Sequence, residues 1–268
     1  MTTNADTLHK AVALLRDARA AVAFTGAGIS TPSGLPDFRS PQGLWATVDP
    51  TTVASRSAFE RDPRRFYRFY RERLDRLRHA APNAAHRALA ALERAGRLRA
   101  VITQNVDGLH QAAGSARVVE LHGNLREAVC PRCGGLWPIA VVVAALDQDR
   151  LPRCDRCGAV LKPNVVLFED LLPADAWEAA TALARAADLM LVVGSSLQVM
   201  PAASLPQETL DAGGALLIVN RDPTPYDHRA AVVVCDDAAR VLPALAAALG
   251  LGEDWTGAPT NSPTEPVE

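Results

Sequence analysis

Two pairs of cysteines in this chain have the spacing of a zinc site. Cys130 and Cys133 form one Cys-x-x-Cys turn, Cys154 and Cys157 form a second, and a glycine follows each pair. Such turns direct two sulfur atoms at one point, so two turns can supply four thiolates to a tetrahedral Zn²⁺. Four thiolates leave no coordination position for water. The pattern therefore predicts a structural metal and places the chemistry elsewhere.

Other interpretations of the cysteines fit less well. Disulfides are typical of secreted proteins, but residues 1–20 mix acidic and apolar side chains, which indicates an amphipathic helix and not a secretion signal. A redox-active Cys-x-x-Cys does not need a matching second pair. The remaining cysteine, Cys235, stands apart from both pairs, and we expect it to be a buried small hydrophobic residue.

A glycine-rich segment, Gly26-Ala27-Gly28-Ile29-Ser30, follows an apolar run. Glycines directly after a strand let backbone N–H groups approach a pyrophosphate closely. However, the third glycine of the usual G-x-G-x-x-G pattern is displaced to Gly34, and no acidic residue stands at the spacing expected for a ribose contact. The segment by itself leaves dinucleotide binding and a structural turn as equal alternatives.

Two polar clusters close later apolar runs. The first is Gln104-Asn105-Val106-Asp107, whose amide and carboxylate groups suit the recognition of a carboxamide, although Asn and Asp also favour tight turns. The second contains His122 directly before a glycine. A lone histidine is more often structural than catalytic, but a position at the mouth of a cleft favours a general base.

The elements that must position these residues alternate between strands and helices. Apolar runs predict strands at 20–25, 99–103, 189–193, 215–220 and 231–234, and helical spacing predicts helices at 59–78, 83–95, 174–187 and 238–249. This alternation predicts an α/β fold, with a Rossmann-like parallel sheet and helices on both of its faces. Ligands bind such sheets at the carboxyl ends of the strands, which is where the glycines and the polar clusters fall.

Two segments interrupt the alternation and predict a smaller lobe. We expect residues 39–80 to form a helical insertion, and residues 125–161, which contain the four cysteines, to form a zinc ribbon. Residues 1–38, 81–124 and 162–250 would then make up the Rossmann-like domain. The tail at 251–268 has little to bury, and we expect it to be disordered.

Composition restricts the class of protein. A chain of 268 residues with 49% hydrophobic content can bury a sizeable core, and it has no apolar run long enough to cross a bilayer. The formal net charge of -2 and the pI near 6.3 disfavour binding to nucleic acid through bulk electrostatics. We therefore expect a cytoplasmic protein, a monomer, with neither a membrane nor a nucleic acid as its partner.

Seven segments of the chain resemble, in order, the motifs of the sirtuins, the NAD-dependent protein-lysine deacylases. They are GAGIS with SGLPDFR, TQNVDGLH, ELHGN, the paired Cys-x-x-Cys, KPNVVLF, VGSSLQV and IVNRDPTP, and they lie between residues 25 and 245. Each motif is weak alone, but seven in the right order are specific. The resemblance implies NAD and a structural Zn²⁺ as cofactors, and acylated-lysine proteins or peptides as substrates.

The resemblance also implies roles for single residues. His122 would be the general base, and Asn105 would act with it at the nicotinamide end of NAD. Nicotinamide would leave first, and the products would be free lysine and O-acyl-ADP-ribose. Val165, Val166, Leu167 and Phe168 would pair with the substrate peptide like an added strand. The residues expected to bind the cofactor are Gly26, Ala27, Gly28, Ile29, Ser30, Asp37, Phe38, Arg39, Gln104, Asn105, Val106, Asp107, Gly194, Ser195, Ser196, Asn220, Arg221, Asp222 and Ala238.

The acyl group is a separate question. Tyr70 and Arg73 stand three residues apart on an expected helix, and Ala54 precedes them where sirtuins that prefer acidic acyl groups carry a small residue. In those sirtuins a similar Tyr-x-x-Arg pair binds the succinyl or malonyl carboxylate. The alternative is a core Tyr70 and a solvated Arg73. Glu169 replaces a glycine of the family, and we expect it to alter the substrate-side loop.

Two further functions stay open at this point. Mono-ADP-ribosyl transfer would use the same cleavage of NAD but would pass the ribose to a protein side chain. A zinc ribbon that binds nucleic acid would explain the arginines near the cysteines, but it would leave His122 and Asn105 without a role.

Overall fold

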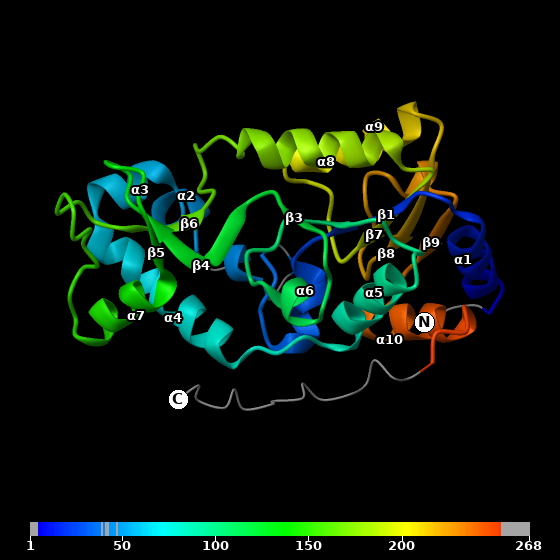
Figure 1. Cartoon of the computed structure of the whole chain (residues 1–268), viewed down its shortest axis with the longest axis horizontal. Coiled ribbons are helices and arrows are strands. Elements are labelled where there is room, and N and C mark those ends of the chain that lie inside the picture. Colours follow the sequence, from blue (N-terminus) through cyan, green and yellow to red (C-terminus); the bar gives the residue numbers. More distant parts are fainter. Residues whose placement is uncertain (1–4, 39, 41–42, 47, 253–268) are drawn as a thin grey trace, which may run out of the picture.

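A six-stranded sheet forms the centre of the larger lobe (Figure 1). The computed structural model describes residues 5–38, 40, 43–46 and 48–252. All neighbouring strands of the sheet are parallel, which confirms the predicted α/β fold. In spatial order the strands are β3 (Val118–Glu120), β2 (Val101–Thr103), β1 (Ala21–Thr25), β7 (Leu189–Val193), β8 (Ala215–Val219) and β9 (Val232–Val234).

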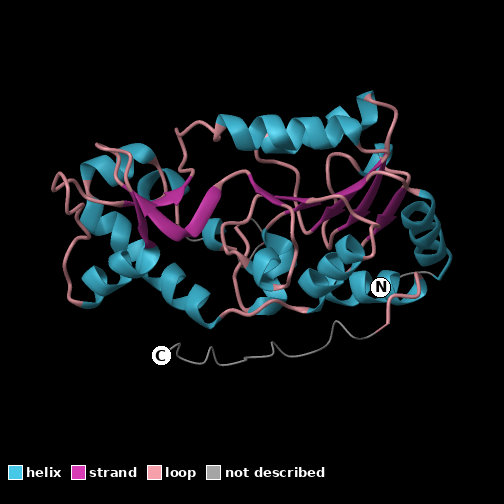
Figure 2. Ribbon diagram, viewed as in Figure 1, coloured by secondary structure: helices cyan, strands magenta, loops and turns pink. Residues whose placement is uncertain are grey.

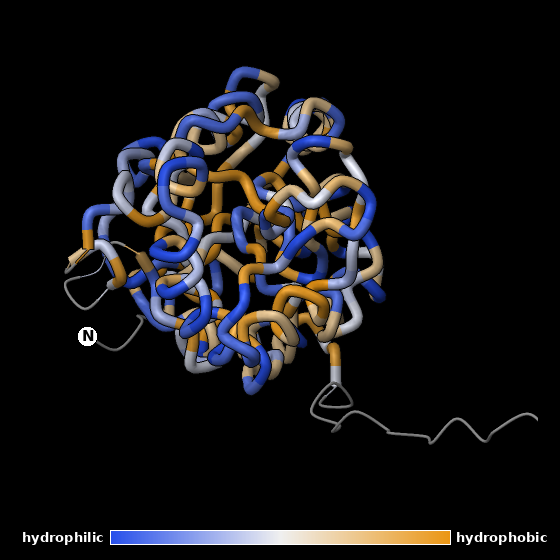
Figure 3. The backbone as a smooth tube through the Cα atoms, turned by 90° about the vertical axis from the view of Figure 1, so that its left-hand side faces the viewer, coloured by the Kyte–Doolittle hydropathy of each residue, from blue (hydrophilic) through white to orange (hydrophobic). Residues whose placement is uncertain are grey.

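Helices cover both faces of this sheet, and the strands alternate their side chains between the two layers. Ala21 and Ala23 of β1 pack with α1 (Ala5–Asp17), α5 (Ala84–Arg94) and α10 (Ala238–Ala248). Val22 and Phe24 point the other way and pack with α8 (Ala174–Ala186) and α9 (Leu205–Asp211). Full burial of a Phe side chain contributes roughly 1.5–3 kcal/mol. In Figure 3 the apolar stretches of the tube accordingly gather toward the interior.

A smaller lobe with its own sheet and helices lies beside the larger one (Figure 2), and it carries the four cysteines. Its sheet places β4 (Gly123–Val129) between β5 (Leu136–Pro138) and β6 (Lys162–Val165), with antiparallel pairing. Four helices complete it: α2 (Pro50–Val53), α3 (Arg56–Arg61), α4 (Pro63–His79) and α7 (Ile139–Asp147). The remaining short elements are η1 (Ala27–Ser33), η2 (Leu44–Ala46), α6 (Leu109–Ala112), η3 (Ala202–Ser204) and η4 (Asp227–Arg229).

Several expectations differ from the structure in detail. The single helix expected at 59–78 is two helices, because Asp62 accepts a hydrogen bond from the backbone N–H of Arg65 and Pro63 starts α4. Cys235, expected to be buried, is exposed where the chain leaves β9.

The division into domains stays a prediction. Arg39 and residues 253–268 of the expected tail lie outside the described residues. No helix in the described ranges has the length and apolar character needed to cross a bilayer.

The four predicted metal ligands converge in the small lobe. The sulfur atoms of Cys130, Cys133, Cys154 and Cys157 all lie within 4.8 Å of one another, and no disulfide joins them. The Sγ atoms of Cys130 and Cys157 are 3.4 Å apart, and those of Cys133 and Cys154 are 3.7 Å apart. Four thiolates about 2.3 Å from a tetrahedral zinc would have similar separations. The residues therefore fit a structural Zn²⁺ that joins the turn after β4 to the turn before β6.

We expect Cys154→Ser to remove the metal and unfold the small lobe, because structural zinc contributes on the order of 10 kcal/mol to the folding of small metal-binding units. Elemental analysis should find one zinc per wild-type chain, and circular dichroism should show a lower melting temperature for the variant. Cys235→Ser is the matched control and should keep both values. Full zinc content and unchanged melting in Cys154→Ser would contradict a four-cysteine site.

Two buried histidines meet beneath the carboxyl ends of the large sheet. His86 of α5 and His110 of α6 are 0% and 1% exposed, and their ring centroids are 4.9 Å apart. Burial lowers the pKa of His110 to about 4. Burial, together with the repulsion that a protonated His110 and Arg87 would exert, lowers the pKa of His86 to about 2. Both rings are therefore neutral in the folded protein near neutral pH.

These two histidines predict that stability falls in mild acid. An unfolded histidine titrates near pH 6.5, so below that pH the unfolded chain binds protons that the folded chain does not. The free energy of unfolding should fall by about 1.4 kcal/mol per pH unit for each histidine as the pH drops from about 6.5 to about 5. Urea unfolding at several pH values measures this slope. His86→Asn should reduce it and His228→Asn, at an exposed site, should not; equal slopes in all three proteins would refute the assignment.

Candidate active site

A large cavity opens where the strand order of the sheet reverses. From β1 the sheet continues to β2 and β3 on one side, and from β7 it continues to β8 and β9 on the other. Parallel sheets bind ligands in the crevice at such a switch point. The cavity has a volume of about 1000 Å³ and is lined by both lobes. This is the upper end of the range for small-molecule sites, and it suits a large ligand.

The structure brings nearly all of the predicted site residues to this one cavity. Apart from the four cysteines, which lie in the small lobe, two are exceptions: Arg39 is not described, and the side chain of Ile29 is 0% exposed within the core. The predicted residues that line the cavity are Gly26, Ala27, Gly28, Ser30, Asp37, Phe38, Ala54, Tyr70, Arg73, Gln104, Asn105, Val106, Asp107, His122, Val165, Val166, Leu167, Phe168, Gly194, Ser195, Ser196, Asn220, Arg221, Asp222 and Ala238.

Glycines allow the segments after β1 and β7 to touch at the floor of the cavity. The N–H of Gly28 donates to the carbonyl of Gly194 over 2.8 Å. A Cβ on Gly194, whose φ is 59°, would lie 2.3 Å from the nitrogen of Ile29, and a Cβ on Gly28 would lie 2.8 Å from the Gly194 oxygen. The two glycines therefore serve backbone packing, and that packing shapes a floor along which a ligand backbone can lie.

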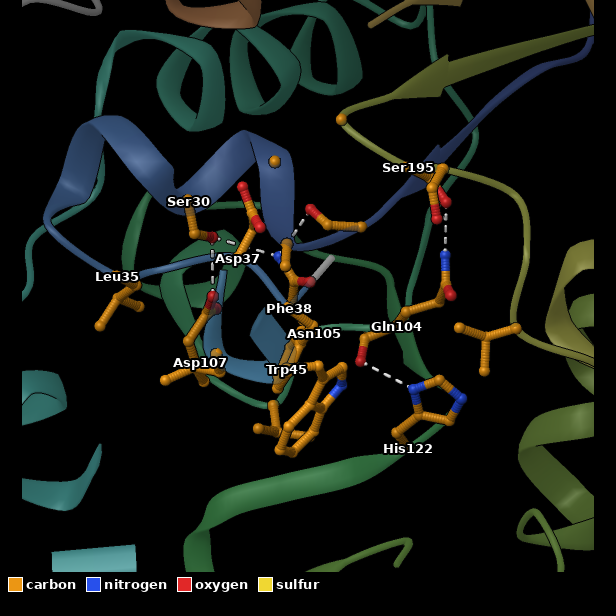
Figure 4. A pocket seen from close by; sticks show the side chains of 18 of the residues that line it. Ser30, Leu35, Asp37, Phe38, Trp45, Gln104, Asn105, Asp107, His122 and Ser195 are labelled. Carbon is orange, nitrogen blue, oxygen red and sulfur yellow. Dashed lines mark hydrogen bonds between the residues drawn. The ribbon is translucent and has the colours of Figure 1, made fainter. Parts of the chain in front are cut away.

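Asn105, Asp107 and Ser30 form one hydrogen-bonded group (Figure 4). The Ser30 hydroxyl donates to Asp107 Oδ2 over 2.7 Å and accepts from Asn105 Nδ2 over 3.1 Å. Asn105 Nδ2 also donates to the Gly26 carbonyl over 3.1 Å, and the Leu109 N–H donates to Asp107 Oδ1 over 2.9 Å. Burial raises the pKa of Asp107 despite these bonds. A half-buried carboxyl group and a buried amide fixed in this way can recognise a carboxamide.

His122 lines the same cavity from the loop between β3 and β4. Its Nδ1 lies 3.0 Å from the carbonyl oxygen of Gln104. Figure 4 marks this contact with a dashed line. A carbonyl can only accept, so Nδ1 carries the proton and the lone pair of the neutral ring resides on Nε2. This is the tautomer that a general base at Nε2 requires. Gln104 also turns its side chain to the opposite wall, where Nε2 donates to Ser195 Oγ over 2.8 Å.

The other wall extends along the ends of β7, β8 and β9. The Leu197 N–H donates to Ser195 Oγ over 3.3 Å, and Asn220 Nδ2 donates to the Asp222 carbonyl over 2.7 Å. Arg221 pairs with Asp237, the N-terminal cap of α10. This wall of the cavity is therefore mainly polar. The residues that line it are Ser195, Asn220, Arg221, Asp222 and Ala238.

The segment 166–170, which follows β6 and is called the strap below, closes the cavity on the side of the small lobe. The Val166 N–H donates to the His122 carbonyl over 2.9 Å, and Phe168 exchanges hydrogen bonds with Ala54 and Arg56. Glu169 keeps a φ of 76°, the conformation that glycine favours, and its carboxylate accepts from the N–H and hydroxyl of Ser57 over 2.9 Å each. Glu169 thus anchors the strap to α3 and does not loosen it.

Aromatic rings and one cation line the end of the cavity beside α4. The guanidinium carbon of Arg73 lies 4.8 Å from the ring centroid of Phe38 and 5.7 Å from that of Tyr70. Its Nε is buried without a hydrogen-bond partner, and burial lowers the pKa of Arg73. Among the described residues no carboxylate forms an ion pair with it. Tyr70 is buried and stacks on Phe66.

Sequence reasoning missed part of the lining. Trp45 stacks against Phe69 with centroids 6.0 Å apart and also contacts Phe38 and Phe168. Trp177 reaches the cavity from α8. None of these aromatics has a spacing that distinguishes it from a core residue, so only the tertiary structure brings them to the site.

Comparisons with known proteins agree with this geometry. The model of the Sir2 family matches residues 26–201. The NAD-dependent protein deacetylase of Caldivirga maquilingensis is 48% identical over 235 residues, which is 87% of this chain and 90% of that protein. The NAD-dependent protein deacylase of Aeropyrum pernix is 45% identical over 238 residues, 89% of this chain and 96% of the relative. A solved Sir2 structure with a p53 peptide and NAD+ has a TM-score of 0.84 and 42% identity, covering 91% of this chain and 99% of that one. The chain belongs to the Sir2 family.

Proposed function

We infer that this chain is an NAD-dependent protein-lysine deacylase. One observation carries the inference: a single cavity joins the glycine floor at the switch point, the Ser30–Asn105–Asp107 group, His122 and the strap after β6. Such a cavity has a place for a dinucleotide along the sheet, a polar pocket for its carboxamide, a base, and residues 165–168 at the end of β6 and in the strap, beside which an extended peptide would lie.

The residues divide the work by position. Asn105 and Asp107 would hold the carboxamide of NAD, and Gly194, Ser195 and Ser196 would hold its ribose and phosphates, with Asn220, Arg221, Asp222 and Ala238 at the adenosine end. Bound NAD would supply the ribose carbon, which would exchange its bond to nicotinamide for a bond to the acyl oxygen of the substrate lysine. His122 would accept a proton at Nε2, while the Gln104 carbonyl holds Nδ1–H and stabilises the ring as it becomes charged.

His122→Ala should lower acyl-lysine turnover by about 10²–10⁴-fold, because a general base contributes that much to the rate. The assay measures nicotinamide release and free lysine from an acetyl-lysine peptide with NAD. Zinc content and melting temperature should stay at wild-type values. His228→Ala, at an exposed histidine, is the matched control and should retain full turnover. Wild-type turnover in His122→Ala would remove His122 from the mechanism.

We also propose that Arg73 lets the site accept acidic acyl groups. Its half-buried guanidinium lines the cavity near Ala54 and Tyr70, and it lacks a carboxylate partner among the described residues. A succinyl or malonyl carboxylate would supply that partner and would accept a hydrogen bond from the buried Nε of Arg73. The competing role is structural. The same guanidinium stacks on Phe38 and could hold the segment around Phe38, which is expected to bind the cofactor, against α4.

Arg73→Met separates these two roles. If Arg73 binds the carboxylate, kcat/KM for succinyl- and malonyl-lysine peptides should fall by about 10- to 100-fold relative to the acetyl-lysine peptide, as expected for the loss of a charge-assisted bond. Arg68→Met, at an exposed arginine of the same helix, is the control. Equal losses on all three peptides would assign Arg73 to the loop and exclude the acidic-acyl pocket.

Mono-ADP-ribosyl transfer would use the same cavity, and mass-tagged NAD distinguishes it. In a deacylase the tagged ADP-ribose carries the acyl group; in a transferase it stays on protein.

We further propose that the enzyme acts as a monomer in the cytoplasm, since the composition favours neither membranes nor nucleic acid as partners.

A further inference from the structure

A chain of buried hydroxyl groups, those of Thr25 and Thr103, connects the Gln104–Asn105 segment of the active site to His110. The proposed mechanism gives His110 no role. Thr25 and Thr103 are the last residues of β1 and β2, and His110 lies in α6. The three are 0%, 2% and 1% exposed, so none of them can touch a ligand in the cavity. Buried polar groups of this kind are retained for the hydrogen bonds they make.

The directions of these hydrogen bonds follow from simple counting. The Thr25 hydroxyl donates to Thr103 Oγ1 over 2.8 Å, so it can only accept from His110 Nε2, which lies 2.9 Å away. His110 therefore carries its proton on Nε2. Its Nδ1 is buried and has no hydrogen-bond partner among the described residues. An aliphatic residue would avoid that unpaired acceptor, so the useful atom of His110 is the Nε2–H donor.

The chain of hydroxyls ends at one peptide group of the active site. Thr103 Oγ1 also accepts from the backbone N–H of Asn105 over 3.0 Å. The carbonyl of that same peptide unit belongs to Gln104, and it is the group that accepts from His122 Nδ1 over 3.0 Å. A peptide group is planar, so fixing the direction of its N–H also fixes the direction of its C=O.

We propose that His110 is a positioning residue for catalysis: through the hydroxyls of Thr25 and Thr103 it orients the Gln104–Asn105 peptide group, which holds the ring of His122. The proposal rests on the deacylase function inferred above. The same peptide carries the Asn105 side chain, but that amide is held separately by Gly26 and Ser30. Loss of the buried chain should therefore disturb the base more than the carboxamide pocket.

Thr25→Val tests this with the least change of shape, because it removes only the connecting hydroxyl. His110→Leu removes the donor, and His110→Gln keeps an N–H at a similar reach. Thr209→Val is the matched control: Thr209 is equally buried and its hydroxyl donates to the Ala184 carbonyl over 2.8 Å, far from the cavity. Turnover of an acetyl-lysine peptide, exchange of labelled nicotinamide into NAD, zinc content and melting temperature are measured for each.

Thr25→Val and His110→Leu should lower kcat for deacylation by about 10- to 100-fold, the usual effect of a small misplacement of a catalytic group. KM for the peptide should change by less than about twofold, and nicotinamide exchange, which does not need the base, should fall less than deacylation. His110→Gln should recover most of the loss, and Thr209→Val should match wild type in both reactions.

Three results would overturn the proposal: deacylation in Thr25→Val as fast as in Thr209→Val, equal losses of exchange and deacylation, or no difference between His110→Leu and His110→Gln. The last comparison decides the matter if Thr25→Val does not fold. A wild-type chain that releases no nicotinamide from NAD and an acyl-lysine peptide would instead defeat the proposed function itself.

Discussion

The close approach of two backbone segments determines where every functional group of this sirtuin lies. After β1 and after β7 the chain passes near enough for Gly28 to donate to the Gly194 carbonyl, at a point where a Cβ would collide with backbone atoms. Because β1 and β7 are neighbours whose connections run in opposite directions, a crevice opens beyond their ends. The segments after β1, β2, β7 and β8 therefore all contribute to one cavity.

Behind this crevice the protein buries a layer of polar groups and keeps its histidines neutral. Ser30, Thr25 and Thr103 connect His86 and His110 to Asn105 and Asp107 through hydrogen bonds. Buried charges would be costly there, and burial accordingly shifts the pKa of both histidines downward and that of Asp107 upward. Hydrogen bonds hold the Ser30, Asn105 and Asp107 side chains in this layer, and the neutral rings of His86 and His110 add no positive charge to it.

The small lobe supplies the opposite wall, and it combines a four-cysteine cluster with aromatic packing. The four cysteines, positioned to bind zinc, lie between β4 and β6, and β6 leads directly into the strap beside the cavity. Glu169 fastens that strap to α3, while Trp45, Phe69 and Phe168 pack around the end of the cavity beside α4, with Arg73 stacked on Phe38. The geometry of that end thus depends on contacts among three separate segments.

Local patterns in the sequence were enough to predict the alternating sheet, the four cysteine ligands and the polar clusters that meet in the cavity, because strand periodicity and turn chemistry act over a few residues. The tertiary structure alone decided that Ile29 packs in the core and that Arg73 stacks on Phe38. The break of one expected helix at Asp62 instead follows from a local cap and from Pro63, which sequence reasoning overlooked. The tertiary structure also connects His110 to His122 by hydrogen bonds through Thr25, Thr103 and the peptide group between residues 104 and 105. No spacing rule in the sequence relates these residues. Such relations depend on which distant segments the folded chain brings together, and hydrogen-bond direction and burial exist only once they have met.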